Sequence, residues 1–343
     1  MNRQEIKFYK ENGFFYNPQL LQMEITNRCP LNCSQCYKPP NGGTDIDIDI
    51  VKELLYDAGK CGIRYLMLNG GEPLIYPHFI ELLNYAKENK MQVACVTSGF
   101  SLTEKYIEEI KKTGCYLQLN ISLNGSTKEI HSKSRDGYEY AMKAIEILNR
   151  NKFPFDFNWV SRTDNVHDFP ALIQFAKKVN AVGITVITTK LTSEGVLQSR
   201  LSTEDYLFLK KICEKEGKFI TIQYCFPFLN RIVNNFNKNR SNRCPSAISV
   251  MCVDAEGYFR PCVHLYNREK RELYDNSIHN YWMNSPIINQ IRNASNKMCE
   301  NCNDCIDKER CRTCFCMNAE NQENLRIGDP DCPIKMLINR EAK

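Results

Sequence analysis

Apolar and polar positions follow two different periods along the first half of the chain. Short apolar runs bounded by turn residues predict strands, and longer stretches with an apolar residue every three or four positions predict helices. The expected strands cover residues 20–26, 64–68, 91–97, 116–123, 155–160 and 184–188, and the expected helices cover residues 50–60, 78–89, 102–112, 138–151 and 169–179. This alternation of strand and helix, with short connections, predicts a parallel sheet that is covered by helices.

The alternation is typical of both a doubly wound sheet and an incomplete barrel, and the periodicity does not decide between them. In both folds the chemistry belongs at the carboxyl ends of the strands. A cysteine-rich stretch over residues 29–36 follows the first expected strand, and a glycine pair at residues 70–71 follows the second. The sequence therefore predicts a site at one edge of the sheet, built from these two loops.

The regular pattern fades after residue 189, where a helix over residues 202–216 and a strand over residues 219–224 are expected. The polar and basic residues 234–243 predict a solvated linker. Two apolar runs beyond the linker flank a turn at residues 254–257, which is a hairpin signal. The expected division is an N-terminal extension (1–19), a barrel or sheet domain (20–190), a bridging segment with the linker (191–243) and a cysteine-rich domain (244–343).

The composition excludes several classes of function. The chain has 343 residues, of which 43% are hydrophobic and 25% are charged, and its formal net charge is +5. This charge is too small for the length to indicate a nucleic-acid partner. No apolar run reaches the roughly 18 residues that a membrane helix needs, and the N-terminal residues lack the apolar core of a signal peptide. We therefore expect a cytoplasmic protein with no membrane partner.

The unusual feature is the presence of 18 cysteines, ten of them between residues 244 and 332. In a reducing compartment, so many thiols indicate metal ligands rather than disulfides. The three cysteines of residues 29–36 have helical spacing, but Pro30 and Asn32 are poor helix residues, so we expect a loop. Iron–sulfur cubanes are normally held by four thiolates, and three thiolates in one loop leave one iron free to bind something else.

The spacing Cys29-x3-Cys33-x2-Cys36 resembles the signature of the radical S-adenosylmethionine (SAM) enzymes. In that family the three cysteines hold a [4Fe–4S] cluster whose open iron binds SAM. Reductive cleavage of SAM produces a 5′-deoxyadenosyl radical, which abstracts hydrogen from the substrate. The resemblance implies a partial (β/α)6 TIM-type barrel, SAM as cofactor and an electron donor of the flavodoxin or ferredoxin type. Gln35 departs from the family pattern, because many members carry an aromatic residue there.

Other loops resemble further motifs of the same family. Asn69-Gly70-Gly71-Glu72-Pro73 resembles the second signature, which receives the SAM amino group, and paired glycines allow a backbone to approach a ligand closely. The small polar residues that end the third and fourth expected strands also resemble family motifs. Arg135 stands where the family often carries an arginine for the SAM carboxylate, a pairing that suits a guanidinium fork. The resemblance therefore implies SAM contacts from Gly70, Gly71, Glu72, Pro73, Ser98, Ser122, Asn124 and Arg135.

The C-terminal cysteines fit two interpretations. The pairs Cys299-x2-Cys302 and Cys311-x2-Cys314 would form a tetrahedral zinc ribbon, which leaves six of the ten cysteines unexplained. The order of all the cysteines from Cys244 onward resembles instead the SPASM domain of radical SAM enzymes, which carries two auxiliary [4Fe–4S] clusters. The resemblance implies an inner cluster held by Cys244, Cys252, Cys262 and Cys316, with Cys314 as the alternate last ligand, and an outer cluster held by Cys302, Cys305, Cys311 and Cys332.

SPASM proteins mostly modify peptides, so the resemblance implies an enzyme that cross-links, oxidises or epimerises a peptide. Because 28 residues precede Cys29, we expect any leader peptide to be bound by the barrel or by a separate protein. Val263 stands where sulfatase maturases usually carry an Asp base, which counts against that activity. Epimerases need a thiol that returns a hydrogen atom, and Cys225 is the candidate, although a buried structural cysteine is the simpler interpretation.

Two other functions stay open at this level. Some members of the family apply the same radical chemistry to a sugar or another small molecule, which would make the chain a dehydrogenase or an epimerase. A non-enzymatic iron–sulfur or zinc-ribbon binding module is a possibility of a different class. Metal analysis separates this module from the enzyme, because three cubanes contain about 12 irons per chain and a ribbon contains zinc.

Overall fold

The computed structural model describes residues 3–38, 43–189, 200–223, 229, 233, 244–265 and 267–294. The strands are β1 Leu20–Thr26, β2 Tyr65–Gly70, β3 Gln92–Thr97, β4 Leu117–Ser122, β5 Phe155–Ser161, β6 Ile184–Thr188, β7 Ile220–Ile222, β8 Val250–Val253 and β9 Phe259–Arg260. The helices are α1 Arg3–Asn12, α2 Ile48–Lys60, α3 Phe79–Glu88, α4 Glu104–Thr113, α5 Lys128–His131, α6 Tyr138–Arg150, α7 Phe169–Lys178, α8 Thr203–Glu216, α10 Ile278–Asn284 and α11 Pro286–Ala294. Short 3-10 helices are η1 Pro73–Ile75, η2 Val166–Asp168, η4 Gly217–Phe219 and η5 Arg271–Tyr274.

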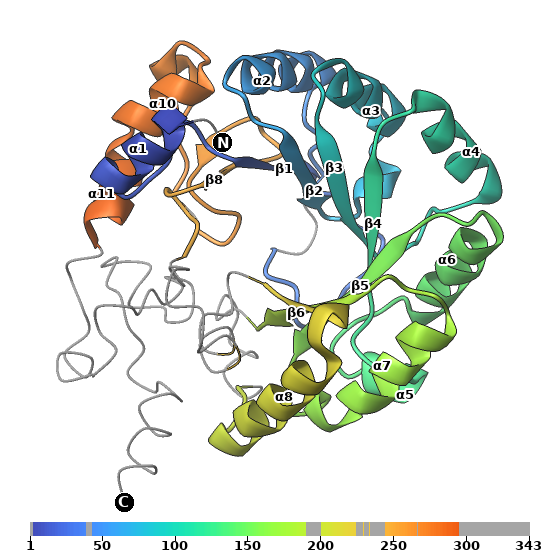
Figure 1. The fold of residues 1–343 in the computed structure, drawn as a ribbon. Helices are drawn as coiled ribbons and strands as arrows, with labels where there is room; N and C mark the ends of the chain where they lie inside the picture. The colour runs from blue at the N-terminus through green and yellow to red at the C-terminus, as the bar shows by residue number, and fades with distance from the viewer. Residues whose placement is uncertain are drawn as a thin grey trace, which may run out of the picture.

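The strands of the described residues form one nine-stranded sheet in the order β7-β6-β5-β4-β3-β2-β1-β8-β9. Every pair from β7 to β8 is parallel, and only β9 runs antiparallel to its neighbour. A doubly wound sheet reverses its strand order at a switch point, whereas β1 to β7 follow one another without a reversal. This order is that of an open barrel, and Figure 1 shows the strands curving around a centre with the helices outside. The prediction of a mostly parallel α/β fold is confirmed.

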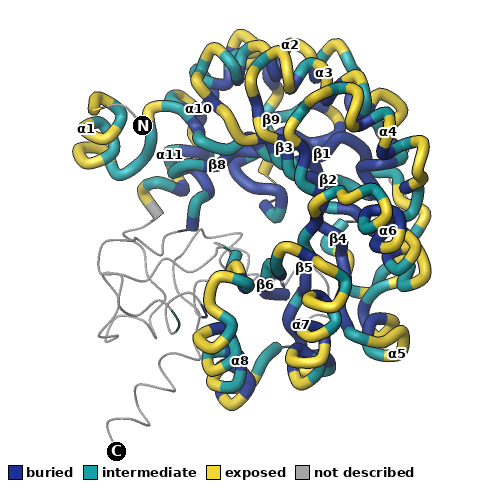
Figure 2. Tube along the Cα trace, turned by 45° about the vertical axis from the view of Figure 1, so that its right-hand side comes forward, coloured by how far each residue is buried: buried dark blue, intermediate teal, exposed yellow. Residues whose placement is uncertain are grey.

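Alternate residues of each strand face the helices. Leu21, Met23 and Ile25 of β1 are 0% exposed, and they belong to the hydrophobic core between the sheet and the outer helices (Figure 2). Because side chains alternate across a strand, Gln22 and Glu24 point to the inside of the barrel. The inner face therefore carries polar groups at its carboxyl end, where the site is expected.

The expected strands and helices agree with the observed ones to within a few residues. Helix α8, for example, begins with a capping box in which the Ser202 hydroxyl accepts from the Asp205 N–H and the Asp205 carboxylate accepts from the Ser202 N–H. The sequence did not predict α1, α5, α10 or α11. Among the helices that the structure describes, none has the length and apolar character needed to cross a membrane.

The segment after the expected linker extends the barrel sheet. Strand β8 pairs with the free edge of β1, with Cys252 in register with Gln22. The N-terminal segment closes over the same edge, because the Trp282 indole N–H donates to the Phe15 carbonyl at 2.7 Å and the Phe15 N–H donates to the Ile248 carbonyl at 2.9 Å. Residues on both sides of the expected boundary at 243 thus share one sheet, and the domain division itself stays a prediction.

Candidate functional site

The cysteine loop, defined here as residues 27–38, follows β1 at the carboxyl edge of the sheet. Cys29 and Cys36 are exposed and Cys33 is half-buried. The pKa of Cys29 is raised, chiefly because burial desolvates its thiol, and the nearby thiols of Cys33 and Cys36 raise it further. A hydrogen bond from the Leu31 backbone acts in the opposite direction and lowers it. The Cys33 and Cys36 thiols therefore lie close enough to Cys29 to influence its pKa.

The described residues contain no group of three His, Cys, Asp or Glu side chains that could hold one metal ion. A cubane binds each thiolate through a different iron, so its ligands surround a cluster and do not converge on a single ion. The lack of a single-ion site among the described residues therefore does not count against a cubane at the cysteine loop.

The loop that follows β4 holds the cysteine loop in place. The Asn32 N–H donates to the Asp136 carboxylate at 2.8 Å, and the Gln35 N–H donates to the Ser134 carbonyl at 3.3 Å. The Asp136 N–H points at the Cys33 sulfur at 3.4 Å. Backbone donors aimed at a cysteine sulfur stabilise its thiolate form.

The glycine pair lets the end of β2 approach the cysteine loop. The Gly71 N–H donates to the Thr26 carbonyl at 2.7 Å, and the Glu72 N–H donates to the Arg28 carbonyl at 2.9 Å. A Cβ atom on Gly71 would lie 2.0 Å from the Arg28 carbonyl oxygen, and one on Gly70, whose φ is +143°, would lie 2.3 Å from the Thr26 oxygen. From the sequence we expected the glycine backbone to approach a ligand closely. In the structure the backbone of Gly71 instead lies against the backbone of Arg28 in the cysteine loop.

The Glu72 carboxylate is 1% exposed and is occupied by neighbouring donors. It accepts from the Leu74 N–H at 3.1 Å, the Thr97 hydroxyl at 2.5 Å and the Ser98 N–H at 2.7 Å, and the Ser98 hydroxyl also donates to it. Two of the expected SAM contacts, Glu72 and Ser98, therefore bind each other and join the ends of β2 and β3.

The Asn124 side chain is also fully used within the protein, and the residue is 0% exposed. Its amide nitrogen donates to the side-chain amide oxygen (Oε1) of Gln35 at 2.8 Å and to the Ser134 hydroxyl at 2.7 Å, and its amide oxygen accepts from the Val160 N–H at 3.1 Å. Asn124 thus connects the cysteine loop to β5.

His131 stabilises the loop after β4 by contacts with Asn124 and Asp136. The Asn124 N–H donates to its Nδ1 at 3.3 Å, and its Nε2 lies 3.1 Å from the Asp136 carbonyl. Burial, the largest cause, lowers the pKa of His131 to about 4. The imidazole is therefore neutral at pH 7, with Nδ1 as the acceptor and Nε2–H as the donor, which agrees with a structural role.

Two buried side-chain atoms near the expected SAM site have no hydrogen-bond partner within the described part of the chain: one belongs to Arg135, an expected SAM contact, and the other to Asn69, which precedes the glycine pair. The atoms are the Nε of Arg135 and the Oδ1 of Asn69. Ser122 is 3% exposed at the end of β4. A buried polar atom without a partner costs free energy, so such atoms point to a ligand.

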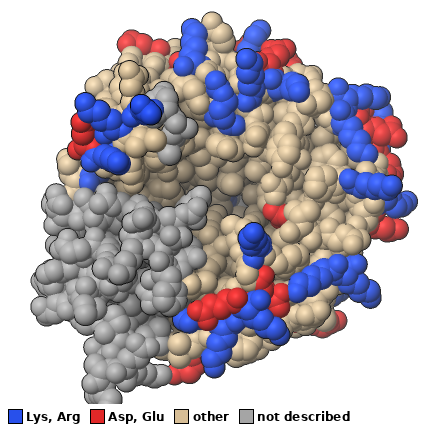
Figure 3. Space-filling model, in the orientation of Figure 1, with Lys and Arg blue, Asp and Glu red and all other residues tan. Residues whose placement is uncertain are grey.

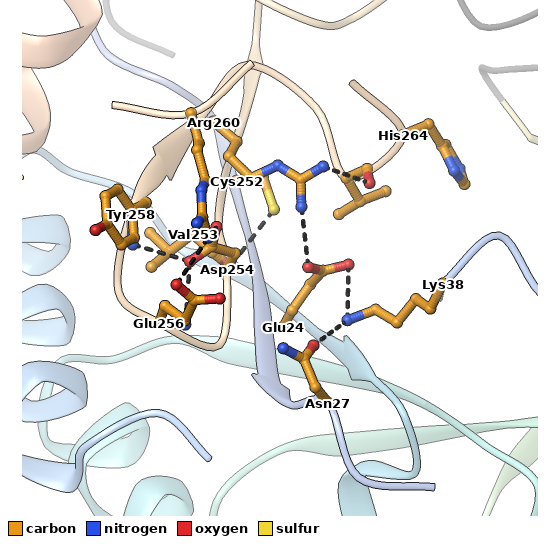
Figure 4. Close-up of polar contacts among 12 residues, drawn as sticks. Glu24, Asn27, Lys38, Cys252, Val253, Asp254, Glu256, Tyr258, Arg260 and His264 are labelled. Atoms are coloured by element: carbon orange, nitrogen blue, oxygen red, sulfur yellow. Dashed lines mark hydrogen bonds and ion pairs between the residues drawn. The ribbon is translucent and has the colours of Figure 1, made fainter. Parts of the chain in front are cut away.

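Sequence reasoning missed a charged centre inside the barrel. Glu24 is 2% exposed, and its carboxylate contacts the Lys38 ammonium and the Arg260 guanidinium, each at 3.2 Å (Figure 4). It also accepts from the Tyr37 hydroxyl at 3.2 Å. Burial raises the pKa of Tyr37 well above its ordinary value, so its hydroxyl stays protonated and donates. A glutamate at an inward position of β1, between the apolar Met23 and Ile25, was the available signal.

Three of the expected auxiliary-cluster ligands are described. Cys244, Cys252 and Cys262 are 9%, 0% and 8% exposed, and desolvation raises the pKa of Cys252 well above its usual range. The other expected ligands and the candidate hydrogen donor lie outside the described residues: Cys302, Cys305, Cys311, Cys314, Cys316, Cys332 and Cys225. Figure 3 shows a hollow at the centre of the face seen in Figure 1, with mostly uncharged side chains around it, while Lys and Arg gather on the outer helices.

Comparisons with known proteins agree with this geometry. Residues 23–176 match the family model of the Radical SAM superfamily. The chain is 24% identical to the AdoMet-dependent heme synthase of Methanosarcina barkeri, over 87% of this chain and 91% of the relative. It is also 24% identical to the PqqA peptide cyclase of Gluconobacter oxydans, over 94% and 92%. The structure of SuiB from Streptococcus suis bound to S-adenosylmethionine has the same fold, with a TM-score of 0.77 at 15% identity over 96% of this chain and 80% of that one.

Proposed function

We propose that this chain is a radical SAM enzyme that abstracts hydrogen from a peptide and cross-links, oxidises or epimerises it. Residues 23–176 match the family model of the Radical SAM superfamily, which supports the proposal. The observation that carries the proposal is the likeness to the PqqA peptide cyclase along 94% of the chain. A second solved structure of SuiB, with a TM-score of 0.73, is bound to its precursor peptide SuiA.

Cys29, Cys33 and Cys36 are the proposed ligands of the radical SAM cluster. The three thiols share one loop, influence one another electrostatically and stand at the carboxyl edge of the sheet. When bound, the cluster and SAM together supply the 5′-deoxyadenosyl radical that abstracts a hydrogen atom. The protein contributes the position of the loop, which the Asp136 and Ser134 hydrogen bonds maintain.

Arg135 is the proposed partner of the SAM carboxylate. Its buried Nε has no partner among the described residues, and a guanidinium binds a carboxylate through two parallel hydrogen bonds. The Asn69 amide oxygen, which is likewise unpaired, and the backbone of Gly70–Gly71 are suited to the SAM amino group. Ser122, at the end of β4, completes the proposed contacts.

Glu72, Pro73, Ser98 and Asn124 have a different proposed role. The side chains of Glu72, Ser98 and Asn124 already form their hydrogen bonds within the protein. Pro73 is buried in η1, the short helix that directly follows Glu72. We therefore propose that these residues shape the SAM site and contact SAM through backbone groups only.

Two auxiliary [4Fe–4S] clusters form part of the proposal. The inner one uses Cys244, Cys252, Cys262 and Cys316, with Cys314 as the alternate last ligand, and the outer one uses Cys302, Cys305, Cys311 and Cys332. The burial of the three described members and the electrostatic interaction between Cys252 and Cys262 support the inner site. A flavodoxin- or ferredoxin-type donor and a separate leader-binding protein are the proposed partners.

The test of the substrate class uses isotope transfer. The enzyme is reconstituted anaerobically and incubated with SAM, a reductant and deuterium-labelled candidate peptides, and the 5′-deoxyadenosine is analysed by mass spectrometry. Deuterium from a peptide supports the proposal, with loss of two hydrogens from the peptide indicating cross-linking or oxidation. SAM cleavage with deuterium transfer from a small molecule, and from none of the peptides, refutes it.

A small-molecule substrate is the second candidate. The observation that favours it is the 24% identity to the AdoMet-dependent heme synthase over 87% of the chain. The same isotope experiment distinguishes the two, because labelled small molecules are tested beside the peptides. A non-enzymatic iron–sulfur or zinc-ribbon module predicts no 5′-deoxyadenosine at all, and the zinc-ribbon form also predicts bound zinc.

A further inference from the structure

Glu24 joins two loops that both carry cysteines. Tyr37 and Lys38, which directly follow Cys36, bind one oxygen of its carboxylate, each at 3.2 Å. Arg260, two residues before Cys262, binds the other oxygen at 3.2 Å. The partners lie 13, 14 and 236 positions away along the chain, so the contact exists only in the folded protein.

Arg260 holds the second loop through its remaining donors. Its Nε donates to the Leu265 carbonyl at 3.0 Å, and one Nη donates to the Val263 carbonyl at 3.1 Å. Residues 260–265, which include Cys262 and are called here the hairpin loop, are thus folded around the guanidinium. On the other side, the Lys38 ammonium also donates to the Asn27 amide oxygen at 2.7 Å, which closes the base of the cysteine loop.

Several charges are buried together at this junction, where Asp254, 6% exposed, is a second carboxylate within electrostatic reach of Arg260. The side chain of Glu24 is 3% exposed and those of Lys38 and Arg260 are 11% exposed, so two cations face one buried carboxylate. Cys252 lies beside them, in register with Arg260 on the β8–β9 hairpin (Figure 4). Because buried charges are little screened by water, the charges of Glu24, Lys38 and Arg260 would act directly on a cluster bound at Cys252.

We propose that Glu24 is a positioning residue that fixes the cysteine loop against the hairpin loop and sets the charge beside the inner auxiliary cluster. Lys38 and Tyr37 transmit the constraint to the first loop, and Arg260 transmits it to the second. The inference deepens the proposed function and rests on it for the identity of the two cluster sites. It assigns a role to residues that the radical SAM and SPASM cysteine patterns do not include.

Hydrogen–deuterium exchange of the holoenzyme tests the positioning. Arg260→Gln is expected to speed amide exchange at least several-fold in residues 29–38, although the substitution lies in the other loop. Arg268→Gln is the matched control, because Arg268 is 43% exposed and pairs with Glu256 at 2.9 Å on the same hairpin. Unchanged exchange in residues 29–38 of Arg260→Gln overturns the proposal. Tyr37→Phe, which removes one hydrogen bond, is a milder variant that must speed exchange in residues 260–265.

A reduction potential tests the electrostatic part. In the background in which Cys29, Cys33 and Cys36 are Ala, Glu24→Gln is expected to shift the inner auxiliary cluster to a more positive potential in an EPR-monitored titration. The reason is that Lys38 and Arg260 lose their counter-charge, and positive charge stabilises the reduced cluster. Glu256→Gln should leave the potential unchanged, and an unaltered potential in Glu24→Gln overturns the proposal. Absence of auxiliary iron in this background would refute the proposed function instead, while the exchange experiment would still report on the junction.

Discussion

Replacement of Gly71 by Ala is expected to separate the end of β2 from the cysteine loop. The added Cβ would lie 2.0 Å from the Arg28 carbonyl oxygen, where ordinary contacts begin at 3.4 Å. The obstacle is backbone and not the flexible end of a side chain, so the backbone must move by about 1.4 Å to relieve it. The cysteine loop is the part that must give way.

The cost follows from the bonds that this movement breaks. The Gly71–Thr26 and Glu72–Arg28 backbone hydrogen bonds, at 2.7 and 2.9 Å, are lost or stretched. Each contributes about 1 kcal/mol, and overpacking adds about 1–3 kcal/mol, so the free energy of unfolding should fall by roughly 3–5 kcal/mol. Iron bound by the cysteine loop should fall with it, because its thiols are no longer held at the strand end.

Urea unfolding followed by circular dichroism measures the stability, and iron analysis of the anaerobic protein measures the cluster. Gly43→Ala is the control, since a Cβ there would have nothing within 4 Å. A Gly71→Ala protein that unfolds within about 0.5 kcal/mol of the wild type and cleaves SAM at the normal rate would refute the reasoning.

Three further predictions concern the same edge of the sheet. Replacement of Cys29, Cys33 and Cys36 by Ala should abolish reductive SAM cleavage and retain roughly two-thirds of the iron, because eight of about 12 irons belong to the proposed auxiliary clusters; continued formation of 5′-deoxyadenosine would contradict the ligand assignment. Arg135→Ala should weaken SAM binding, measured by equilibrium dialysis, much more than it lowers iron content, and an unaltered SAM affinity would remove Arg135 from the site. Stability should decrease as the pH falls from about 6.5 toward 4, because the buried His131, with its pKa lowered to about 4, binds fewer protons folded than unfolded. The loss at pH 5 should be about 2 kcal/mol in urea unfolding, and a His131→Gln variant with the same pH slope would show that another group is responsible.

The local parts of this protein could be predicted well from the sequence. Hydrophobic periodicity located β1 to β7 and, apart from the four-residue α5, the α-helices between them, because burial of one face repeats with the period of the element itself. The cysteine loop could also be predicted locally, because Pro30 and Asn32 disfavour a helix between Cys29 and Cys36, and the role of its thiols as cluster ligands stays a prediction. The hydrogen bonds that Glu72, Ser98 and Asn124 form within the protein could not be predicted, because a motif does not reveal which of its side chains bind one another.

The sequence by itself therefore determined the order of strands and helices and the resemblance of its cysteine and glycine loops to radical SAM motifs. Only the tertiary structure decided that the strands follow one another as an open barrel, that β8 joins the edge of β1, and that Glu24 meets Arg260 from 236 residues away. The physical reason is that periodicity and spacing record which face of an element is buried. They do not record which distant element buries it, and that partner is chosen when the whole chain packs.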